Sequence, residues 1–172
     1  MAISADGTSV LWRTGAGNVL VSGTTAAFTD VSSLPSLSTI AADNKDAKVF
    51  YGASGSSFYI SRDAGRTFSS IGTLTNSSSP YKIAAHPTVA GDVWVSTNTG
   101  LLHSTNSGAT FKAVPNVSQA WDIALGAPSS FGRYPAIFAV AKVFGTGGIY
   151  RSDNAGVNLL PLREMTFSCT FP

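Results

Sequence analysis

Few side chains in this sequence could do acid–base chemistry. Its 172 residues include nine Asp and Glu residues and two His residues. Two carboxylates placed together, one of them kept protonated by its surroundings, could hydrolyse a bond by general acid–base catalysis. Most of the acids, however, fall in short polar connections where Asp is a common turn former. These are Asp6, Asp43, Asp46, Asp63, Asp92 and Asp153.

Asp122 stands apart from that group, because it lies beside Trp121 at the head of an apolar run. Its simplest interpretation is a solvated loop carboxylate. His86 and His103 are isolated along the chain, and no Ser/His/Asp arrangement or His/Glu metal-ligand spacing occurs. We therefore predict no catalytic residue, no metal site and no cofactor in this chain.

A repeated motif is the strongest feature of the elements that would position these side chains. The pattern Ser-x-(Asp/Asn)-x-Gly occurs three times, at starts 43 and 48 residues apart, and its first two copies continue to x-Thr-Phe. The residues of these boxes are Ser61, Asp63, Gly65, Thr67 and Phe68; Ser104, Asn106, Gly108, Thr110 and Phe111; and Ser152, Asn154 and Gly156.

The sequence around each box repeats as well. Strand-like runs precede the boxes at 38–42, 48–51 and 57–60, then at 81–85, 92–95 and 100–103, and again at 121–125, 136–140 and 148–151. A fourth run follows the first two boxes. Four short antiparallel strands in about 45 residues are typical of a β-propeller blade, so we predict an all-β chain forming a partial propeller of three to four blades. A β-sandwich with a coincidental motif is the alternative.

Each box is predicted to form the turn between the third and fourth strands of a blade. The Asp or Asn side chain accepts hydrogen bonds from the turn, and the glycine supplies a positive φ. Asp63 could instead be a catalytic carboxylate, but a catalytic acid is not expected once in every blade. We therefore interpret it as structural.

Composition excludes several classes of protein. The net charge is only +2 and the basic residues are scattered, which argues against a nucleic-acid partner. No apolar run reaches the length of a membrane span, and the first residues do not resemble a signal peptide. The single cysteine, Cys169, excludes a disulfide within the chain.

The boxes match the Asp-box of the BNR-type repeats, which occur in sialidases, sortilin-like receptors and glycoside hydrolase family 74. With the segments 2–12, 48–68, 100–111 and 134–156, the chain resembles the second half of the C-terminal propeller of family 74 xyloglucanases. That resemblance implies two seven-bladed propellers with xyloglucan in the cleft between them. It also implies inverting hydrolysis by two aspartates, within the chain or from its reducing end, and a secreted enzyme.

The chain departs from that family in three ways. It is too short, with three recognisable blades and part of a fourth out of fourteen. Both catalytic aspartates of the family fall outside the matching stretch, so no residue here is predicted to be catalytic, and whether this chain alone is an enzyme stays open. The last box is broken after Gly156. We therefore divide the chain into a partial propeller at 1–158, a fragment of the larger protein, and a divergent tail at 159–172 from a frameshift or an intron read-through.

A sugar is expected to touch the face opposite the boxes, on loops joining the fourth strand to the next blade and the second strand to the third. Aromatic faces stack on sugar rings, while amides and charges bond hydroxyl groups. The candidates for binding a xyloglucan or related β-glucan oligosaccharide are Tyr81, Asn98, Trp121, Asp122, Lys142 and Phe144. Packing between blades is the competing interpretation of Tyr81 and Trp121, and Trp12 and Trp94 are predicted to be core residues.

A second hypothesis is a non-catalytic propeller module of the sortilin type or one that binds carbohydrate. Glycan binding separates the two, because a hydrolase remnant should favour xyloglucan oligosaccharides. Two sequons, at Asn76 and Asn116, would permit N-glycosylation in a secreted protein.

Overall fold

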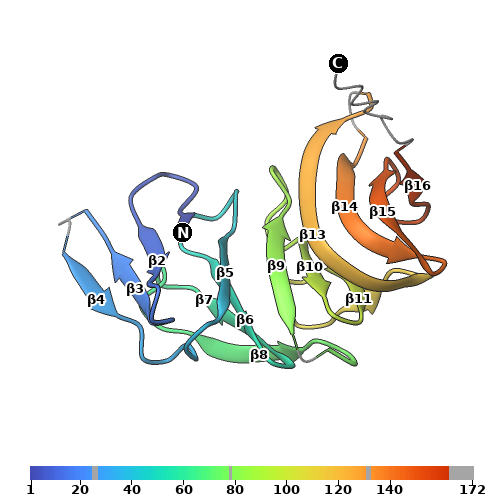
Figure 1. Ribbon diagram of the computed structural model, residues 1–172. Coiled ribbons are helices and arrows are strands. Elements are labelled where there is room, and N and C mark those ends of the chain that lie inside the picture. The colour runs from blue at the N-terminus through green and yellow to red at the C-terminus, as the bar shows by residue number, and fades with distance from the viewer. Residues whose placement is uncertain (25–26, 78, 131–132, 163–172) are drawn as a thin grey trace, which may run out of the picture.

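The computed structural model describes residues 1–24, 27–77, 79–130 and 133–162 (Figure 1). These residues form four antiparallel sheets of four strands each, and in every sheet the strands follow one another in chain order. We call the sheets blades 1 to 4. The predicted all-β partial propeller is confirmed. Its fourth blade has all four strands, whereas the sequence predicted only part of a fourth blade.

The strands of the four blades have the following bounds. Blade 1 contains β1 (Ala2–Ile3), β2 (Val10–Arg13), β3 (Val19–Ser22) and β4 (Phe28–Asp30). Blade 2 contains β5 (Thr39–Ala42), β6 (Phe50–Ser54), β7 (Ser57–Ser61) and β8 (Ser69–Thr73). Blade 3 contains β9 (Pro80–Ala85), β10 (Val93–Thr97), β11 (Gly100–Ser104) and β12 (Lys112–Ala113). Blade 4 contains β13 (Val117–Pro128), β14 (Pro135–Val143), β15 (Thr146–Ser152) and β16 (Leu160–Pro161).

The first strand of each blade is the innermost one. Strand β5 contacts both β1 and β9, and β9 contacts β13, so these strands line the concave side of an arc. Figure 1 shows the blades succeeding one another along this arc, with blades 1 and 4 at its two ends. Inner strands from different blades therefore share one surface.

The hydrophobic core is divided into three clusters, one between each pair of consecutive blades. Leu11 and Phe50 belong to the cluster between blades 1 and 2, Phe58 and Val93 to the next, and Trp94 to the third. A single four-stranded sheet cannot bury both of its faces, so each blade depends on its neighbours for its apolar contacts.

The three box segments form the same hydrogen-bonded turn. In each, the serine Oγ donates to the Asp or Asn Oδ1 at 2.7, 2.8 and 2.9 Å, and accepts the glycine N–H at 2.9, 2.9 and 3.0 Å. The same Oδ1 accepts the N–H four residues later, at 2.9, 3.0 and 2.9 Å. The turn is therefore closed by two side chains as well as by its backbone.

Two consecutive residues in each box have a positive φ. In the first box these are Ala64 at 63° and Gly65 at 86°, and the other boxes repeat the pattern. Both residues therefore have the left-handed backbone conformation, which glycine adopts without strain. The residue after each turn points back toward the preceding blade, as Phe111 does by packing edge-on against Phe58 at 4.9 Å.

Replacing Asp63 by Asn should preserve the box, because Asn106 and Asn154 occupy the same position in the other two. Partial burial raises the pKa of Asp63, but hydrogen bonds from Thr67 and Ser61 outweigh it and hold the pKa below its usual value. The carboxylate therefore contributes stability above about pH 4, and this contribution is lost as the pH falls through the lowered pKa.

We expect Asp63→Asn to cost about 1 kcal/mol or less at pH 7 and less still near pH 2.5. Thermal melts of both proteins across that range measure the difference in stability. Asn106→Asp is the reciprocal variant and should gain acid sensitivity. A difference that stays constant with pH would contradict a role for the Asp63 carboxylate.

A buried aspartate joins blades 2 and 3. Asp43, 1% exposed, accepts the Tyr51 hydroxyl at 2.7 Å and the Gly91 N–H of blade 3 at 2.9 Å. Its other oxygen accepts two N–H groups of its own turn, those of Lys45 and Asp46. Burial raises the pKa of Asp43, but these hydrogen bonds outweigh it and leave the pKa below its usual value.

Two expectations from the sequence change. Trp94 is fully buried as predicted, but Trp12 is 47% exposed, because no described part of the chain covers its face of blade 1. The boundary set at residue 158 falls inside blade 4, since Leu160 and Pro161 pair with Arg151 and Tyr150 as strand β16. Residues 163–172, which include Cys169, lie outside the described residues, and the origin of the tail stays a prediction.

Candidate functional site

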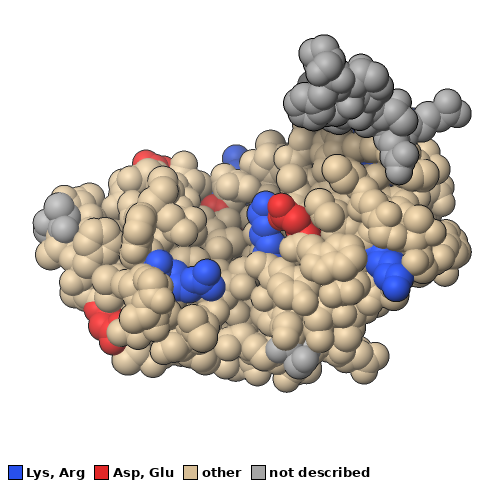
Figure 2. All heavy atoms as spheres, in the orientation of Figure 1, with Lys and Arg blue, Asp and Glu red and all other residues tan. Residues whose placement is uncertain are grey.

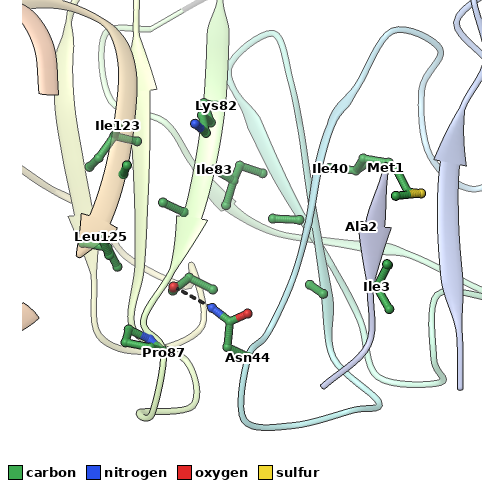
Figure 3. A pocket seen from close by; sticks show the side chains of 15 residues that line it. Met1, Ala2, Ile3, Ile40, Asn44, Lys82, Ile83, Pro87, Ile123 and Leu125 are labelled. Atoms are coloured by element: carbon green, nitrogen blue, oxygen red, sulfur yellow. Dashed lines mark hydrogen bonds between the residues drawn. The ribbon is translucent and has the colours of Figure 1, made fainter. Parts of the chain in front are cut away.

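A groove of about 450 Å³ runs along the inner strands. Figure 3 shows Ile83 and Ile123 on one side of it and Ile40 and Ile3 on the other, with Asn44 near one end. Asn44 donates to the Ala85 carbonyl of the next blade at 2.9 Å, which fixes that end. The walls are mainly small apolar side chains and backbone, and Figure 2 shows that uncharged residues cover most of this face of the molecule.

An ion pair between blades 3 and 4 provides charge beside this groove. Lys82 Nζ lies 2.8 Å from Asp122 Oδ1, and both side chains are about half exposed. The Lys82 ammonium beside Asp122, together with the Ile123 N–H, holds the pKa of that carboxyl below its usual value. Asp122 is therefore part of strand β13 and paired, in contrast to the solvated loop carboxylate that we expected.

Tyr81 and Trp121 occupy corresponding places in neighbouring blades. Tyr81 precedes Lys82 on β9 and Trp121 precedes Asp122 on β13, in the parallel sequences 81–85 and 121–125. Each aromatic side chain is 42% exposed. Each aromatic residue therefore precedes one partner of the ion pair on its strand, and neither is among the residues that line the groove.

Trp121 lies at an irregularity in the longest strand. The pairing of β13 with β14 shifts between Ala120 and Asp122, which leaves Trp121 as the extra residue of a β-bulge. Bulges twist a strand locally and re-aim a side chain, and they are common beside binding and active sites. The pairing shifts at two further points of β13, and Figure 1 shows its strong curvature.

Asn98 is used inside the protein. It lies in the turn between β10 and β11, where its Oδ1 accepts the Ser77 hydroxyl and the Ser79 N–H, each at 3.2 Å. Its own N–H donates to the Ser79 carbonyl at 3.1 Å. These bonds hold the connection from β8 to β9, so Asn98 positions the loop that leads to Tyr81.

Lys142 and Phe144 lie farther along blade 4. Lys142 is an exposed residue of β14 opposite Gln119, and Phe144 is at the tip of the β14–β15 turn. Phe144 is 79% exposed and has φ at 50°, which is rare for a bulky residue. Its N–H donates to the Asn116 carbonyl at 2.9 Å, so the turn is held against the connection that precedes β13.

The sequence indicated two isolated histidines, but both have specific partners in the structure. His103 Nε2 lies 2.9 Å from Asp92 Oδ1, and its ring stacks on Trp94 at 3.9 Å. Tyr134 of blade 4 donates its hydroxyl to the same Asp92 oxygen at 2.7 Å and accepts the Trp94 indole N–H at 2.8 Å. The ring of His86 packs edge-on against Tyr134. Trp94 and His103 pair on neighbouring strands of blade 3, but Tyr134 lies 42 residues after Asp92, so only the stacking of blade 4 completes the network.

Four of the described carboxylates do not suit a general acid. Such an acid needs a pKa raised by its surroundings. The pKa values of Asp43, Asp63 and Asp122 are all lowered by hydrogen bonds or by Lys82. Asp92 is only 6% exposed and is held within its network, so a substrate cannot reach it.

Two further searches concern only the described residues. No group of three or more His, Cys, Asp or Glu side chains there could hold a metal ion. None of these residues forms a helix long and apolar enough to cross a membrane.

The chain matches known proteins over almost its whole length. It is 40% identical over 163 residues to a xyloglucanase of Hypocrea jecorina, which covers 92% of this chain and 19% of that protein. It is 30% identical to a xyloglucanase of a Paenibacillus species, over 95% of this chain and 17% of that protein. The chain is homologous to one part of the family 74 xyloglucanases. It spans about a fifth of the length of these curated relatives.

Solved structures of family 74 enzymes have the same fold. The GH74 xyloglucanase from Xanthomonas campestris matches with a TM-score of 0.82 at 25% identity, over 95% of this chain and 24% of that one. The GH74 enzyme from Niastella koreensis gives a TM-score of 0.84 over 94% and 24%, at 24% identity. No protein-family model matches the chain. The four blades thus correspond to about a quarter of a family 74 structure.

Proposed function

We propose that this chain forms part of the surface on which a xyloglucan-degrading hydrolase binds its glucan chain. The observation that carries the proposal is the pair Tyr81 and Trp121, half-exposed aromatic residues at corresponding places of adjacent inner strands. Each is next in sequence to one partner of the Lys82–Asp122 ion pair. The xyloglucanase relatives supply the substrate class. The catalytic carboxylates come from outside this chain.

The chemistry of this surface suits a neutral polysaccharide. Sugar rings present C–H groups that pack against aromatic faces. Tyr81 and Trp121 are already half exposed, so they can offer such faces without a rearrangement of the chain. The half-exposed ion pair can exchange hydrogen bonds with sugar hydroxyl groups, because each partner has donor or acceptor capacity left over. Phe144, held outward at its strained turn, is a third apolar contact on blade 4.

The isolated chain should not hydrolyse xyloglucan. Inverting glycosidases need two carboxyl groups about 6.5–9.5 Å apart, one of them protonated at the working pH. Reducing-sugar release from xyloglucan, measured over a day at pH 4 to 7, is expected to equal that of a protein-free control. Release above this background would place a catalytic pair within the chain.

Binding of xyloglucan oligosaccharides should depend on Trp121. We expect Trp121→Ala to weaken binding about tenfold, because a lost aromatic contact is worth roughly 1 kcal/mol or more. Isothermal titration calorimetry with a xyloglucan oligosaccharide measures the change, and Tyr81→Ala should act in the same direction.

Trp12→Ala is the matched control, since Trp12 is 47% exposed but lies at the far end of the arc on blade 1. It should leave the affinity for the oligosaccharide unchanged. Equal losses in Trp12→Ala and Trp121→Ala would contradict the proposed surface. A chain that binds no xyloglucan oligosaccharide at all would favour a module without a role in xyloglucan degradation.

A further inference from the structure

Tyr81 is the extra residue of a β-bulge in the innermost strand of blade 3. The pairing of β9 with β10 passes from Lys82 to Pro80 in a single step along β10, which leaves Tyr81 as the additional residue. Trp121 has the same place in β13 of the next blade. Bulges twist a strand locally and re-aim a side chain, and they are common beside binding sites. Both aromatic residues of the proposed binding surface are therefore bulge residues.

The corresponding strand of blade 2 has neither the bulge nor the aromatic residue. Ser38 corresponds to Tyr81 and Trp121, because each lies two residues before the isoleucine of its segment. Strand β5 pairs with β6 without a shift, and Ser38 is completely buried. Tyr81 is 42% exposed, although blade 3 contacts a described blade on each side. The exposure of Tyr81 therefore goes with the bulge and not with an uncovered face of a blade.

The chain on either side of Tyr81 is anchored to the neighbouring blades. The Pro80 carbonyl accepts the Thr39 hydroxyl of blade 2 at 3.2 Å. The Lys82 ammonium lies 2.8 Å from Asp122 Oδ1 of blade 4. Because the two contacts reach in opposite directions along the arc, the bulge is fixed relative to both neighbours.

Asn98 holds the residues that lead into the bulge. Its Oδ1 accepts the Ser79 N–H and the Ser77 hydroxyl, each at 3.2 Å, and Ser77 is 4% exposed. The Asn98 N–H donates to the Ser79 carbonyl at 3.1 Å, so both backbone polar groups of Ser79 are bonded to this one residue. Pro80 follows, and its ring fixes φ at about −65°. Little conformational freedom therefore remains between Asn98 and the backbone of Tyr81.

We propose that Asn98 is a positioning residue for the sugar contact made by Tyr81. It holds Ser79 and thereby sets the direction in which the bulge presents the Tyr81 ring, without itself contacting the glucan chain. The use of the ring in binding rests on the proposed function, whereas the orientation of the ring does not. A ring that is already held in place loses less entropy when a ligand binds, so removal of the support should weaken binding.

The orientation of Tyr81 can be measured without a ligand. Fluorine-19 NMR of the 172-residue chain labelled with 3-fluorotyrosine reports on its five tyrosines, and Tyr81→Phe identifies the signal of Tyr81. Asn98→Ala should shift or broaden that signal and leave those of the other tyrosines in place. Asn98→Asp keeps an oxygen that accepts both bonds, so it should restore the signal. An unchanged Tyr81 signal in Asn98→Ala would overturn the proposal.

Binding separates this role from a general effect on stability. Titration calorimetry with a xyloglucan oligosaccharide should show an affinity about fivefold weaker for Asn98→Ala, with Asn98→Asp close to the parent chain. The loss should persist when Trp121→Ala is also present and vanish when Tyr81→Ala is present, because Asn98 acts through the Tyr81 ring. Equal losses in the two backgrounds would contradict this role.

Asn106→Ala is the matched control. Asn106 also accepts a hydroxyl and an N–H within blade 3, but in the box turn between β11 and β12. It should leave the Tyr81 signal and the affinity unchanged, and circular dichroism melts verify that every variant is folded. A shifted Tyr81 signal in Asn106→Ala would mean that any loosened turn of blade 3 moves the ring, which also overturns the proposal. If Tyr81→Ala leaves the affinity unchanged, the proposed function fails, and the NMR signal alone then decides whether Asn98 positions the ring.

Discussion

Asp43→Ala is expected to lower the free energy of unfolding by about 3–4 kcal/mol, which is a large part of the stability of a domain of this size. The substitution removes the acceptor of the Tyr51 hydroxyl and the Gly91 N–H, both of which are buried where no water replaces it. Each unsatisfied buried donor costs about 1–3 kcal/mol. Urea unfolding followed by tryptophan fluorescence measures the loss.

The neighbouring turn supplies the control for Asp43. Asp46→Ala also removes a carboxylate, but Asp46 accepts only the exposed Lys48 N–H through its side chain, so it should cost less than about 1 kcal/mol. Tyr51→Phe removes one donor and leaves Asp43 with three. Its loss of stability should fall between those of Asp43→Ala and Asp46→Ala. Equal effects of Asp43→Ala and Asp46→Ala would show that the contact with blade 3 adds nothing to stability.

Gly108→Ala should lower the free energy of unfolding by roughly 3–4 kcal/mol, which is similar to the effect of Asp43→Ala but has a steric cause. Gly108 has φ at 87°, where an alanine costs about 1–2 kcal/mol, and the added Cβ would overlap the ring of Phe58. Phe58 is fully buried between blades 2 and 3, so its ring cannot swing into solvent. Overpacking of this kind costs a further 1–3 kcal/mol or so.

Gly55 separates the two contributions. It also has a positive φ, at 56°, but a Cβ there would meet nothing within 4 Å. Gly55→Ala should therefore cost only about 1 kcal/mol, the conformational part alone. Thermal or urea unfolding of both variants measures the contrast, and similar losses would mean that the Phe58 ring yields to the new methyl group.

Part of the candidate site could be anticipated from the sequence. Tyr81 and Trp121 were visible as aromatic residues at the heads of two similar segments, and both are half exposed on adjacent inner strands. Lys82 was overlooked, although it and Asp122 stand at matching positions of the same segments with opposite charges. Reading the repeats against one another for complementary charge would have found that pair.

Other features could not be anticipated, because they join residues that only blade stacking brings together. The bonds of Asp43 to Gly91 and of Asp92 to Tyr134 each cross from one blade to the next. Sequence patterns identify Asp43 and Asp92 as turn residues, since turns are local and contacts between blades are not. The exposure of Trp12 could not be anticipated either. Trp12 has the same place in its strand as Val95, counted from the residues that pair with Ser22 and Ser104, yet Val95 is fully buried and Trp12 is 47% exposed.

The sequence by itself determined the blades: short alternating strands and the recurring Ser-x-(Asp/Asn)-x-Gly turn define each four-stranded unit through local hydrogen bonds and backbone conformation. Only the tertiary structure decided which face of each blade is covered, how the inner strands combine into a groove, and which charges meet between neighbouring blades. The physical reason is that burial belongs to a pair of stacked sheets. A residue such as Trp12 is therefore predicted as core from the sequence and has an exposed side chain among the described residues.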